Sequence, residues 1–480
     1  MQLRRSNIIS RLILHNNSRR EFTNRISFKD IIKTNKNDSK KLILVENLSA
    51  KNSSINGHSL RECFNVKIDN FWTWNYRRRN FALIQLNKID DVMKIQSNCG
   101  YNLHALPIRT RMIETNFPAI DHHESSQSPY ELGINVKKSL SCSDLKERFP
   151  TNEQLIIHLT EMNSLNELDE LLRYFLITQL EDIICQSVFS DFNIYPFGSS
   201  LIGLGDSTSD LDLALLHVHQ WRKNRDINFA MPELKSERDQ TQQCLSLIAD
   251  IIRNFMPNIS KVNRILRARI PIVKMSFDLA PIDIDISIEL STETGHHGLL
   301  MADYLHYCVS QHVNIKQFLL FLKYWSKQHG VVKSIPGNWF SNFQILALAI
   351  YFLQKEQILK PIVNIDDNEQ QQSITNVMNT MKMIYSFFEF LISFDFEKEA
   401  ISIQTGKSFT KPDFSPLYIE NPMEPTLNIC KNVSGVEFKK LLLQAYNSLD
   451  AFHCKDFHLA DLLDPEYFKT LEKRNNQSVR

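Results

Sequence analysis

Residues 196–215 read PFGSSLIGLGDSTSDLDLAL, and the end of this stretch alternates between acidic and apolar side chains. Such alternation predicts a β-strand, in which Asp210 and Asp212 project to one face while Leu211 and Leu213 pack on the other. Two carboxylates this close repel each other unless a cation lies between them. Hard oxygen ligands at this spacing suit Mg²⁺ or Mn²⁺. The stretch therefore predicts a strand with a metal site on one face.

A Gly-Ser pair stands upstream of the two aspartates. Gly198 would let the backbone approach a phosphate closely, and Ser199 could donate a hydrogen bond to that phosphate. Taken alone, an Asp-x-Asp sequence is most often a solvated strand edge or turn, and a Gly-Ser pair is a still weaker indication. Their order and spacing, together with a later acidic strand, make the combined pattern much more specific.

The later acidic strand spans residues 282–287, IDIDIS. Asp283 and Asp285 share one face of it, and either could join the first two aspartates in a cluster of three carboxylates. The chain between the two segments is long enough for further strands and a helix. Three carboxylates that hold two metal ions are suited to in-line phosphoryl transfer. One ion lowers the pKa of the attacking hydroxyl, and the other stabilises the leaving pyrophosphate.

The composition is that of a globular protein with several domains. A chain of 480 residues predicts two or three domains, and 43% apolar with 23% charged residues excludes a disordered chain. The net charge of +1 gives no overall attraction to nucleic acid, so any phosphate-binding surface must be local. The eight cysteines include no CxxC pair and indicate neither a zinc site nor a disulfide framework. The best apolar run, 343–353, is too short to cross a membrane and predicts a buried helix.

The first 20 residues contain five arginines and no acid, with Ile and Leu interleaved among Ser and Asn. This composition is typical of a mitochondrial presequence, which we expect at residues 1–30, and it lacks the unbroken apolar core of a secretory signal. The alternative is an unstructured basic arm. A presequence would direct the protein to the mitochondrial matrix.

Residues 40–115 predict a small α/β module, and a polar linker follows over 116–150. The expected elements of the module are strands at 42–45, 81–86 and 107–113 and a helix at 89–95.

Two larger domains are expected after the linker. The sequence from Thr151 to Gln154 fits a capping box and begins a helical region that runs towards Ser187. A strand-rich stretch follows over 193–290, interrupted by a helix at 241–255. From Leu299 onward the chain is mostly helical. The expected boundaries are 151–298 for the first domain, 299–460 for the second and 461–480 for a C-terminal tail.

Two lysines lie four residues apart on an expected helix of the second domain. Lys323 and Lys327 would share one helix face and could clamp a triphosphate, while Trp325 would face the core. Taken alone, this spacing is more often part of an exposed helix face.

The order of Gly-Ser, Asp-x-Asp and a third aspartate on a later strand resembles the DNA-polymerase-β-type nucleotidyltransferases. Three longer strings are similar to the mitochondrial poly(A) polymerases of that superfamily. These are SIPGNW at 334–339, followed by Asn342 and Phe343, then KPDFSPLYIENP at 411–422 and LNICKNVS at 427–434. The resemblance covers roughly residues 40–435, and the strings are far more specific than the aspartate pattern.

The resemblance implies an α+β fold with three parts. These are a nucleotidyltransferase palm built of a mixed sheet with helices, a helical poly(A)-polymerase-associated domain, and an N-terminal ferredoxin-like module related to RNA-recognition domains. It implies a polynucleotide adenylyltransferase that adds AMP from ATP to RNA 3′ ends without a template and releases pyrophosphate. The implied cofactor is Mg²⁺ or Mn²⁺. The implied partners are RNA 3′ ends, with mitochondrial transcripts as their source, and a second copy of the chain that binds through the N-terminal module.

Individual roles carry over to the positions that match the family pattern. Asp210 and Asp212 would hold both metal ions, and Asp285 would hold the ion that activates the RNA 3′-hydroxyl. Asp283 has no counterpart in the pattern and is expected to be structural. The implied nucleotide-binding residues are Gly198, Ser199, Lys323, Lys327, Ser341, Asn342, Phe343 and Leu427.

Two of these positions bear on the choice of base. Phe343 falls where relatives often have a tyrosine that stacks on the incoming base, so the stacking is kept and one hydrogen bond is lost. Leu427 falls where uridylyl-transferring relatives carry a histidine that favours UTP. An apolar side chain cannot make that contact, which favours ATP. The alternative is that Leu427 is simply a core residue.

The N-terminal module departs from a working RNA-recognition sheet, which stacks bases on aromatic side chains of its two central strands. Leu44 and Leu83 stand where aromatic residues are expected, and only Phe81 is kept. Base stacking on this sheet is therefore not expected, and the resemblance implies a role in dimerisation instead.

A run of aromatic residues in the same module ends in three arginines. The run comprises Phe71, Trp72, Trp74 and Tyr76, and the arginines are residues 77–79. Aromatic and arginine side chains together can stack on and neutralise single-stranded RNA, or they can form a protein interface. The sequence leaves both interpretations open.

Two alternative functions also remain open. The first is a terminal uridylyltransferase or a short-oligomer transferase of the same superfamily, and Leu427 argues against uridylation. The second is a catalytically inactive relative that holds RNA or a protein partner. The presence of all three expected catalytic aspartates argues against it.

Overall fold

The computed structural model describes residues 28–48, 57–100, 106, 108–116, 141–217, 236–290, 296–333, 335, 337–364 and 378–468. Several segments discussed above lie outside the described residues. They are the expected presequence up to residue 27, most of the expected linker, two residues of the string at 334–339, and the chain after residue 468. The chain forms two compact units. The first comprises residues 1–137, 165–201 and 205–302, and the second comprises residues 138–164, 202–204 and 303–480.

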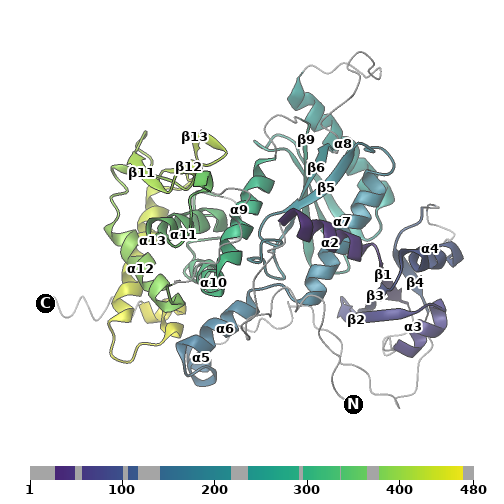
Figure 1. The fold of residues 1–480 in the computed structure, drawn as a ribbon, viewed down its shortest axis with the longest axis horizontal. Coiled ribbons are helices and arrows are strands. Elements are labelled where there is room, and N and C mark those ends of the chain that lie inside the picture. Colours follow the sequence, from purple (N-terminus) through teal and green to yellow (C-terminus); the bar gives the residue numbers. More distant parts are fainter. Residues whose placement is uncertain are drawn as a thin grey trace. The chain divides into compact units, whose positions relative to one another are not determined.

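The N-terminal module of the first unit is a four-stranded sheet with two helices on one face (Figure 1). Its elements are β1 (Leu42–Asn47), α3 (Gly57–Phe64), β2 (Ile68–Tyr76), β3 (Arg79–Leu86), α4 (Ile89–Asn98) and β4 (Met112–Thr115). The element order β-α-β-β-α-β and the strand order β2-β3-β1-β4 match the expected ferredoxin-like module, but β4 pairs parallel with β1, where that fold has an antiparallel pair. The closing strand begins at Met112, later in the chain than expected.

Both faces of this sheet are buried, because its strand residues alternate between two separate cores. Ile43 and Ile84 pack with the residues of α3 and α4. Leu44, Trp74 and Leu83 belong instead to the large core of the palm. The face that would stack bases in an RNA-recognition domain is therefore covered within the first unit.

The tryptophans of β2 form this internal interface. Trp74 is 1% exposed, stacks on Phe81 with ring centroids 5.4 Å apart, and donates from Nε1 to the carbonyl oxygen of Leu279 at 3.0 Å. Trp72 is also buried and donates from Nε1 to Glu167 at 3.4 Å. Both tryptophans thus pack within the chain itself, which is neither of the two roles considered for the aromatic run.

A helix that the sequence pattern did not indicate, α2 (Phe28–Ser39), packs along α7 (Glu167–Ile184). Lys36 of α2 donates to Glu181 Oε1 at 2.5 Å and to the carbonyl oxygen of Ile194 at 3.0 Å. The segment FKDIIKTNKNDS has few apolar residues, so its periodicity is weak. This helix therefore overlaps the last three residues of the interval 1–30 expected for the presequence.

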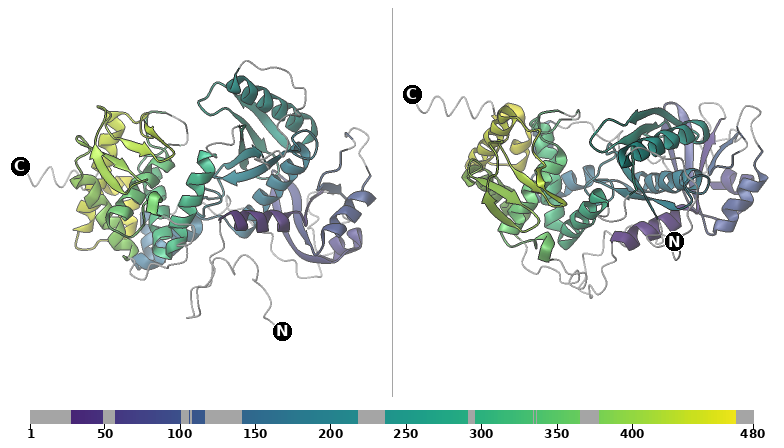
Figure 2. Two further views of the ribbon diagram at one scale, coloured as in Figure 1. Left: turned by 45° about the horizontal axis from the view of Figure 1, so that its top comes forward. Right: turned by 90° about the horizontal axis from the view of Figure 1, so that it is seen from above.

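The palm of the first unit is a five-stranded mixed sheet with α7 and α8 (Glu237–Phe255) on one face (Figures 1 and 2). Its strands are β5 (Phe192–Phe197), β6 (Leu211–His217), β7 (Ile259–Ile265), β8 (Ile272–Phe277) and β9 (Ile282–Glu289), in the order β5-β6-β9-β8-β7. β6 and β9 are parallel, whereas the other neighbouring strands are antiparallel. The strand-rich stretch and its interrupting helix were thus predicted correctly.

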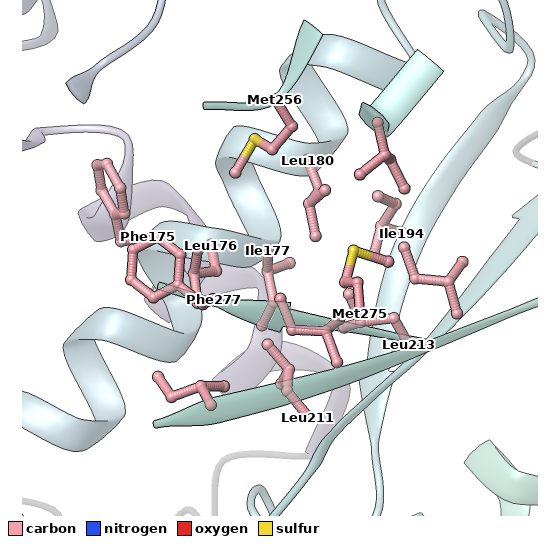
Figure 3. Close-up of a cluster of buried hydrophobic side chains, with 14 of the residues drawn as sticks. Phe175, Leu176, Ile177, Leu180, Ile194, Leu211, Leu213, Met256, Met275 and Phe277 are labelled. Carbon is pink, nitrogen blue, oxygen red and sulfur yellow. The ribbon is translucent and has the colours of Figure 1, made fainter. Parts of the chain in front are cut away.

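Apolar side chains from one face of the sheet meet those of α7 in the core of the palm (Figure 3). Leu211 and Leu213 of β6 and Met275 of β8 are fully buried there, beside Ile177 and Leu180 of the helix. Each such side chain contributes about 1.5–3 kcal/mol by leaving water. Because strand side chains alternate, burial of these residues directs the acidic residues of β6 and β9 to the opposite face.

The helical region expected from Thr151 to Ser187 is two helices, α6 (Asn152–Met162) and α7. Thr151 caps α6 in a capping box with Gln154, as predicted. Asn166 starts α7 by accepting a hydrogen bond from the backbone N–H of Asp169 at 2.8 Å. α6 belongs to the second unit, which differs from the expected boundary of the palm at 151–298.

The second unit is mostly helical, as predicted. Its helices are α5 (Cys142–Arg148), α6, the end of α9 (His297–Gln311), α10 (Val313–Gln328), α11 (Asn342–Lys355), α12 (Thr380–Ser393) and α13 (Gly435–Phe452). α11 is buried from Gln344 to Gln354, and Trp325 of α10 is fully buried, as predicted. In the part of the chain that the structure describes, no helix is long and apolar enough to cross a membrane.

A small sheet in the second unit was not predicted. It consists of β10 (Glu399–Ser402), β11 (Lys407–Thr410), β12 (Ile419–Asn421) and β13 (Glu424–Asn428), in the order β11-β10-β12-β13. Strands of three to five residues are too short to show a clear alternation in the sequence. Leu462, Leu463 and Phe468 are buried, so this part of the expected tail at 461–480 belongs to the packed second unit.

Trp74→Ala should destabilise the first unit by about 3–5 kcal/mol, because it removes a large buried side chain and leaves a cavity between module and palm. The measurement is urea denaturation followed by circular dichroism. Met93→Ala, at an exposed position on α4, is the matched control and should change the unfolding free energy by less than about 0.5 kcal/mol. Equal losses in the two variants would contradict an interface that depends on Trp74.

Candidate active site

Strand pairing places two of the three expected catalytic residues in one row across the palm sheet. Phe197 on β5 pairs with Asp212 on β6, and Asp212 pairs with Asp285 on β9. Asp285 in turn pairs with Lys274 on β8, and Lys274 pairs with Asn263 on β7. Side chains opposite one another on neighbouring strands share a face and lie within contact distance. The parallel register of β6 and β9 therefore puts two of the three carboxylates side by side.

Asp210 completes the cluster from the turn just before β6. The Nζ atom of Lys274 lies 3.1 Å from Asp210 Oδ2 and 3.2 Å from Asp285 Oδ1, so one ammonium group bridges the two carboxylates. The structure thus brings Asp285 together with Asp210 and Asp212, from which it is distant in the sequence.

Asp283 occupies the next row along the same face. Its Oδ1 accepts a hydrogen bond from Ser276 Oγ at 2.6 Å, across the β8–β9 pair. This hydrogen bond is consistent with the structural role expected for Asp283. Asp285, in the row of Asp212, is therefore the better placed of the two candidates for the third carboxylate.

Gly198 follows β5 and lies against the carboxylate of Asp212. Its φ angle is +80°, a conformation that L side chains rarely adopt, and a Cβ atom added here would lie 2.1 Å from Asp212 Oδ2. Ser199 is partly buried beside it, and Ser200 Oγ donates to the carbonyl oxygen of Asp210 at 2.5 Å. The Gly-Ser segment is therefore tied directly to the acidic turn, as their joint pattern suggested.

Arg173 fixes the turn that precedes Asp210, and the sequence analysis did not single it out. Its side chain is fully buried in α7, and Nη2 donates to the carbonyl oxygen of Ser209 at 2.8 Å. Nη1 donates to the carbonyl oxygen of Asp169 at 3.1 Å. Burial lowers the pKa of this arginine, although Asp169 and Asp206 oppose that effect. An arginine inside the apolar run LLRYFLI was the signal that could have identified it.

The carboxylates are held in an environment that disfavours their ionised forms. Burial raises the pKa of Asp212 to about 7, and the negative charges of Asp285 and Asp210 add to the effect. Burial also raises the pKa of Asp285, against the opposing charge of Lys274. A cation beside these groups would favour their ionised forms.

Lys274 is a second residue of the site that the sequence pattern did not single out. Burial by itself would lower its pKa, but hydrogen bonds and charges from Asp210 and Asp285 outweigh that effect and raise it. The residue belongs to the strand IVKMSF, in which Lys274 and Ser276 are the polar members of an alternating pattern. That alternation, next to the acidic strand IDIDISIE, was the available signal.

The donor set fits a divalent cation. Carboxylates are hard oxygen ligands, and Asp285 Oδ1 is buried and accepts no hydrogen bond of good geometry, although Lys274 lies 3.2 Å away. Among the described residues, no three His, Cys, Asp or Glu side chains already form a metal-binding group. The ammonium of Lys274 lies between Asp210 and Asp285 instead. Phosphate oxygens of a bound nucleotide would complete the coordination.

The expected nucleotide-binding lysines lie on α10 in the second unit. Lys323 is partly buried and donates from Nζ to the carbonyl oxygen of Leu204 at 2.8 Å. Lys327 is exposed one turn further along the helix. Lys323 therefore helps to hold the short segment that follows the Gly-Ser loop, in addition to any role towards a ligand.

The remaining expected residues lie at the start of α11 and on β13. Ser341 caps α11 in a capping box with Gln344, and its hydroxyl oxygen accepts from the backbone N–H of Gln344 at 3.3 Å. Asn342 is exposed and Phe343 is partly buried. Leu427 is also only partly buried, so it is not a residue of the core. Phe343 and Leu427 are thus both partly exposed.

Family models match both large parts of the chain. The model described as "Poly(A) RNA polymerase, mitochondrial-like, central palm domain" matches residues 153–295. The model described as "Nrap protein PAP/OAS-like domain" matches residues 314–458. The first of these contains every residue of the carboxylate cluster.

Relatives of known name are similar over most of the chain. It is 29% identical over 62% of its length to the mitochondrial poly(A) RNA polymerase of Drosophila melanogaster, of which it covers 53%. It is 28% identical over 77% of its length to the corresponding protein of Mus musculus, of which it covers 68%. The chain thus spans between about half and two thirds of these relatives. A crystal structure of mtPAP in complex with ATPγS has the same fold, with a TM-score of 0.81, 24% identity, and coverage of 91% of this chain and 99% of that one. The expected α+β fold is therefore confirmed.

Gly198→Ala should weaken Mn²⁺ binding about 10- to 100-fold, because the new Cβ would displace the carboxylate of Asp212. The measurement is isothermal titration calorimetry with MnCl₂. Gly203→Ala is the matched control, since Gly203 has a φ of +82° but its Cβ would meet nothing closer than 3.8 Å. Similar weakening in both variants would mean that backbone strain, rather than contact with Asp212, is responsible.

Proposed function

We propose that this chain, which is similar to the mitochondrial poly(A) RNA polymerases, is a template-independent RNA adenylyltransferase. It would add AMP from ATP to RNA 3′ ends and release pyrophosphate. The observation that carries this function is the placement of Asp212 and Asp285 side by side on parallel strands, with Asp210 and the Gly198 turn next to them. This geometry suits phosphoryl transfer, and the similarity to named relatives supports RNA as the acceptor.

The reaction forms a bond between the RNA 3′-oxygen and the α-phosphorus of ATP. It breaks the bond from that phosphorus to the oxygen of the leaving pyrophosphate, and the hydroxyl proton is lost. Asp210, Asp212 and Asp285 would hold Mg²⁺ or Mn²⁺, whose charge lowers the pKa of the hydroxyl and stabilises the pyrophosphate. Ser200 and Arg173 fix the turn that carries Asp210, so they would keep this carboxylate in position.

The residues of the second unit would bind the nucleotide. Lys327 is exposed and could pair with the triphosphate, and Lys323 would contribute from the same helix face. Phe343 offers a partly exposed ring for stacking on the base. Leu427 is partly exposed and apolar, so it would give UTP no hydrogen bond and supports the choice of ATP.

We also propose a cellular location and an oligomeric state for the protein. The arginine-rich, acid-free sequence of residues 1–20 and the mitochondrial relatives support import into the mitochondrial matrix, which a reporter fused to residues 1–40 would test. Dimerisation through the N-terminal module is proposed from the family resemblance. Because one face of its sheet is covered by the palm and the other by α3 and α4, a dimer would use another surface of the module.

A terminal uridylyltransferase is the second candidate, since it would use the same carboxylate cluster. A catalytically inactive scaffold is less well supported, because the three carboxylates lie together with the glycine that their packing requires.

Primer extension provides the direct test of the function. Purified protein with labelled RNA, Mn²⁺ or Mg²⁺ and each NTP separately should give a ladder with ATP. The double variant Asp210→Ala, Asp212→Ala should lose at least about 1,000-fold in rate, because the metal ions lose two carboxylate ligands. A ladder mainly with UTP would keep the chemistry and overturn the choice of nucleotide. No ladder from folded wild-type protein would favour the scaffold.

Leu427→His tests the choice of base on its own. A histidine at this position would offer a hydrogen bond to uracil, so the ratio of UTP to ATP incorporation should rise by about 10-fold. The measurement is the ratio of kcat/KM for the two nucleotides on one RNA. Val436→His, at an exposed position on α13, is the control and should leave the ratio unchanged. An unchanged ratio in Leu427→His would remove the argument from this residue.

A further inference from the structure

The position of Lys274 creates a conflict with the metal ions that the same carboxylates would hold. Its Nζ atom lies 3.1 Å from Asp210 Oδ2 and 3.2 Å from Asp285 Oδ1, in the space between two ligands of the proposed metal site. An ammonium group and a divalent cation repel each other strongly at such distances. Lys274 and the metal ions would therefore compete for these carboxylate oxygens, and we expect metal binding to displace the ammonium.

The strand row shows where a displaced Lys274 can go. The row runs from Phe197 through Asp212 and Asp285 to Lys274 and then to Asn263 on the edge strand β7. Asn263 is exposed, and the side chain of Lys274 keeps 35% of its surface exposed. The flexible four-carbon stem of a lysine allows its ammonium to turn from the carboxylates towards this outer side of the row.

The same row of residues indicates whether the phosphate that binds the displaced ammonium belongs to the nucleotide or to the RNA. Gly198, proposed to lie against the triphosphate, contacts the carboxylate cluster from the β5 side, at Asp212. Lys274 flanks the cluster from the β8 side, beyond Asp285. The two strands are separated by β6 and β9, so a phosphate beside Lys274 and Asn263 would belong to the second substrate. That substrate is the RNA whose 3′-hydroxyl attacks.

We propose that Lys274 is an internal counter-ion of the catalytic carboxylates, which leaves them for a phosphodiester near the RNA 3′ end when metal ions bind. This inference rests on the proposed function and adds a positioning residue to it. Without RNA, Lys274 neutralises the cluster and competes with the metal. With RNA, a phosphate stabilises the displaced ammonium, so metal and RNA each favour the binding of the other. The exchange involves no covalent step and no transfer of a proton.

The test measures Mn²⁺ binding by isothermal titration calorimetry in three states: alone, with a single-stranded RNA that ends in a 3′-deoxynucleotide, and with a non-hydrolysable ATP analogue. In the wild type, RNA should tighten Mn²⁺ binding by about 10-fold, because it removes the competing ammonium. Lys274→Met should bind Mn²⁺ about 10-fold more tightly than the wild type in the absence of RNA, and RNA should no longer change that affinity. Lys274→Arg keeps the charge and should retain the coupling.

The control is Lys261→Met, which removes an exposed positive charge from β7 of the same sheet. This variant should leave the Mn²⁺ affinity and its dependence on RNA unchanged. It therefore distinguishes the loss of the specific Lys274 contacts from the loss of any positive charge on the sheet. Melting curves of all variants identify any that fail to fold. If Lys274→Met does not fold, Lys274→Gln, which also removes the charge, takes its place.

Two outcomes would overturn the inference. If Lys274→Met binds Mn²⁺ no more tightly than the wild type, the ammonium does not compete with the metal. If the ATP analogue tightens Mn²⁺ binding more in the wild type than in Lys274→Met, while RNA has no such Lys274-dependent effect, the phosphate partner of Lys274 is the nucleotide. Primer extension with the wild type, run in parallel, separates this inference from the proposed function. If the wild type extends RNA but RNA does not change its Mn²⁺ affinity, only the role of Lys274 is rejected. Absence of extension removes the adenylyltransferase, while the Mn²⁺ titration without RNA still decides whether Lys274 competes.

Discussion

The mutual repulsion of three clustered carboxylates is the constraint on which the rest of the palm depends. Asp212 and Asp285 are adjacent because β6 and β9 are parallel and in register, and Asp210 joins them from the preceding turn. Burial, together with the charges of Asp285 and Asp210, raises the pKa of Asp212 to about 7, so the ionised form of this carboxyl depends on positive charge beside it. Lys274 supplies one such charge within the protein. An arrangement that is costly without a cation is suited to binding one.

The surroundings of the cluster are rigid where the carboxylates must be held. Fully buried Arg173 ties the turn at Ser209 to α7, and Ser200 ties the glycine loop to Asp210. The opposite face of the sheet is packed against α7 and α8, which leaves β6 and β9 little freedom to shift. The helix α7 thus supports the catalytic row from behind and positions its acidic turn through one arginine.

The same helix explains why the N-terminal module belongs to the first unit. Arg111, next to β4, is almost fully buried and donates to Thr178 Oγ1 of α7 at 2.6 Å and to the carbonyl oxygen of Ser39 at 2.6 Å. Trp74 adds a hydrogen bond to the palm at Leu279. In RNA-recognition domains, one face of the corresponding sheet stacks on bases. Here that face packs against the palm, which accounts for the apolar residues Leu44 and Leu83 at its centre.

The sequence by itself determined features that depend on near neighbours: the alternation of Asp212 with buried Leu211 and Leu213 on β6, the capping box at Thr151, the buried helix α11, and strands β1 and β3. Side-chain alternation and helix capping act over a few residues, so they can be read from a single sequence. Only the tertiary structure decided that Lys274 bridges two of the carboxylates, that Arg173 holds the acidic turn, and that the tryptophans of β2 are internal. These contacts depend on strand register and on segments distant in the chain, and a shift of one residue in register would place the other face of a strand in the same position.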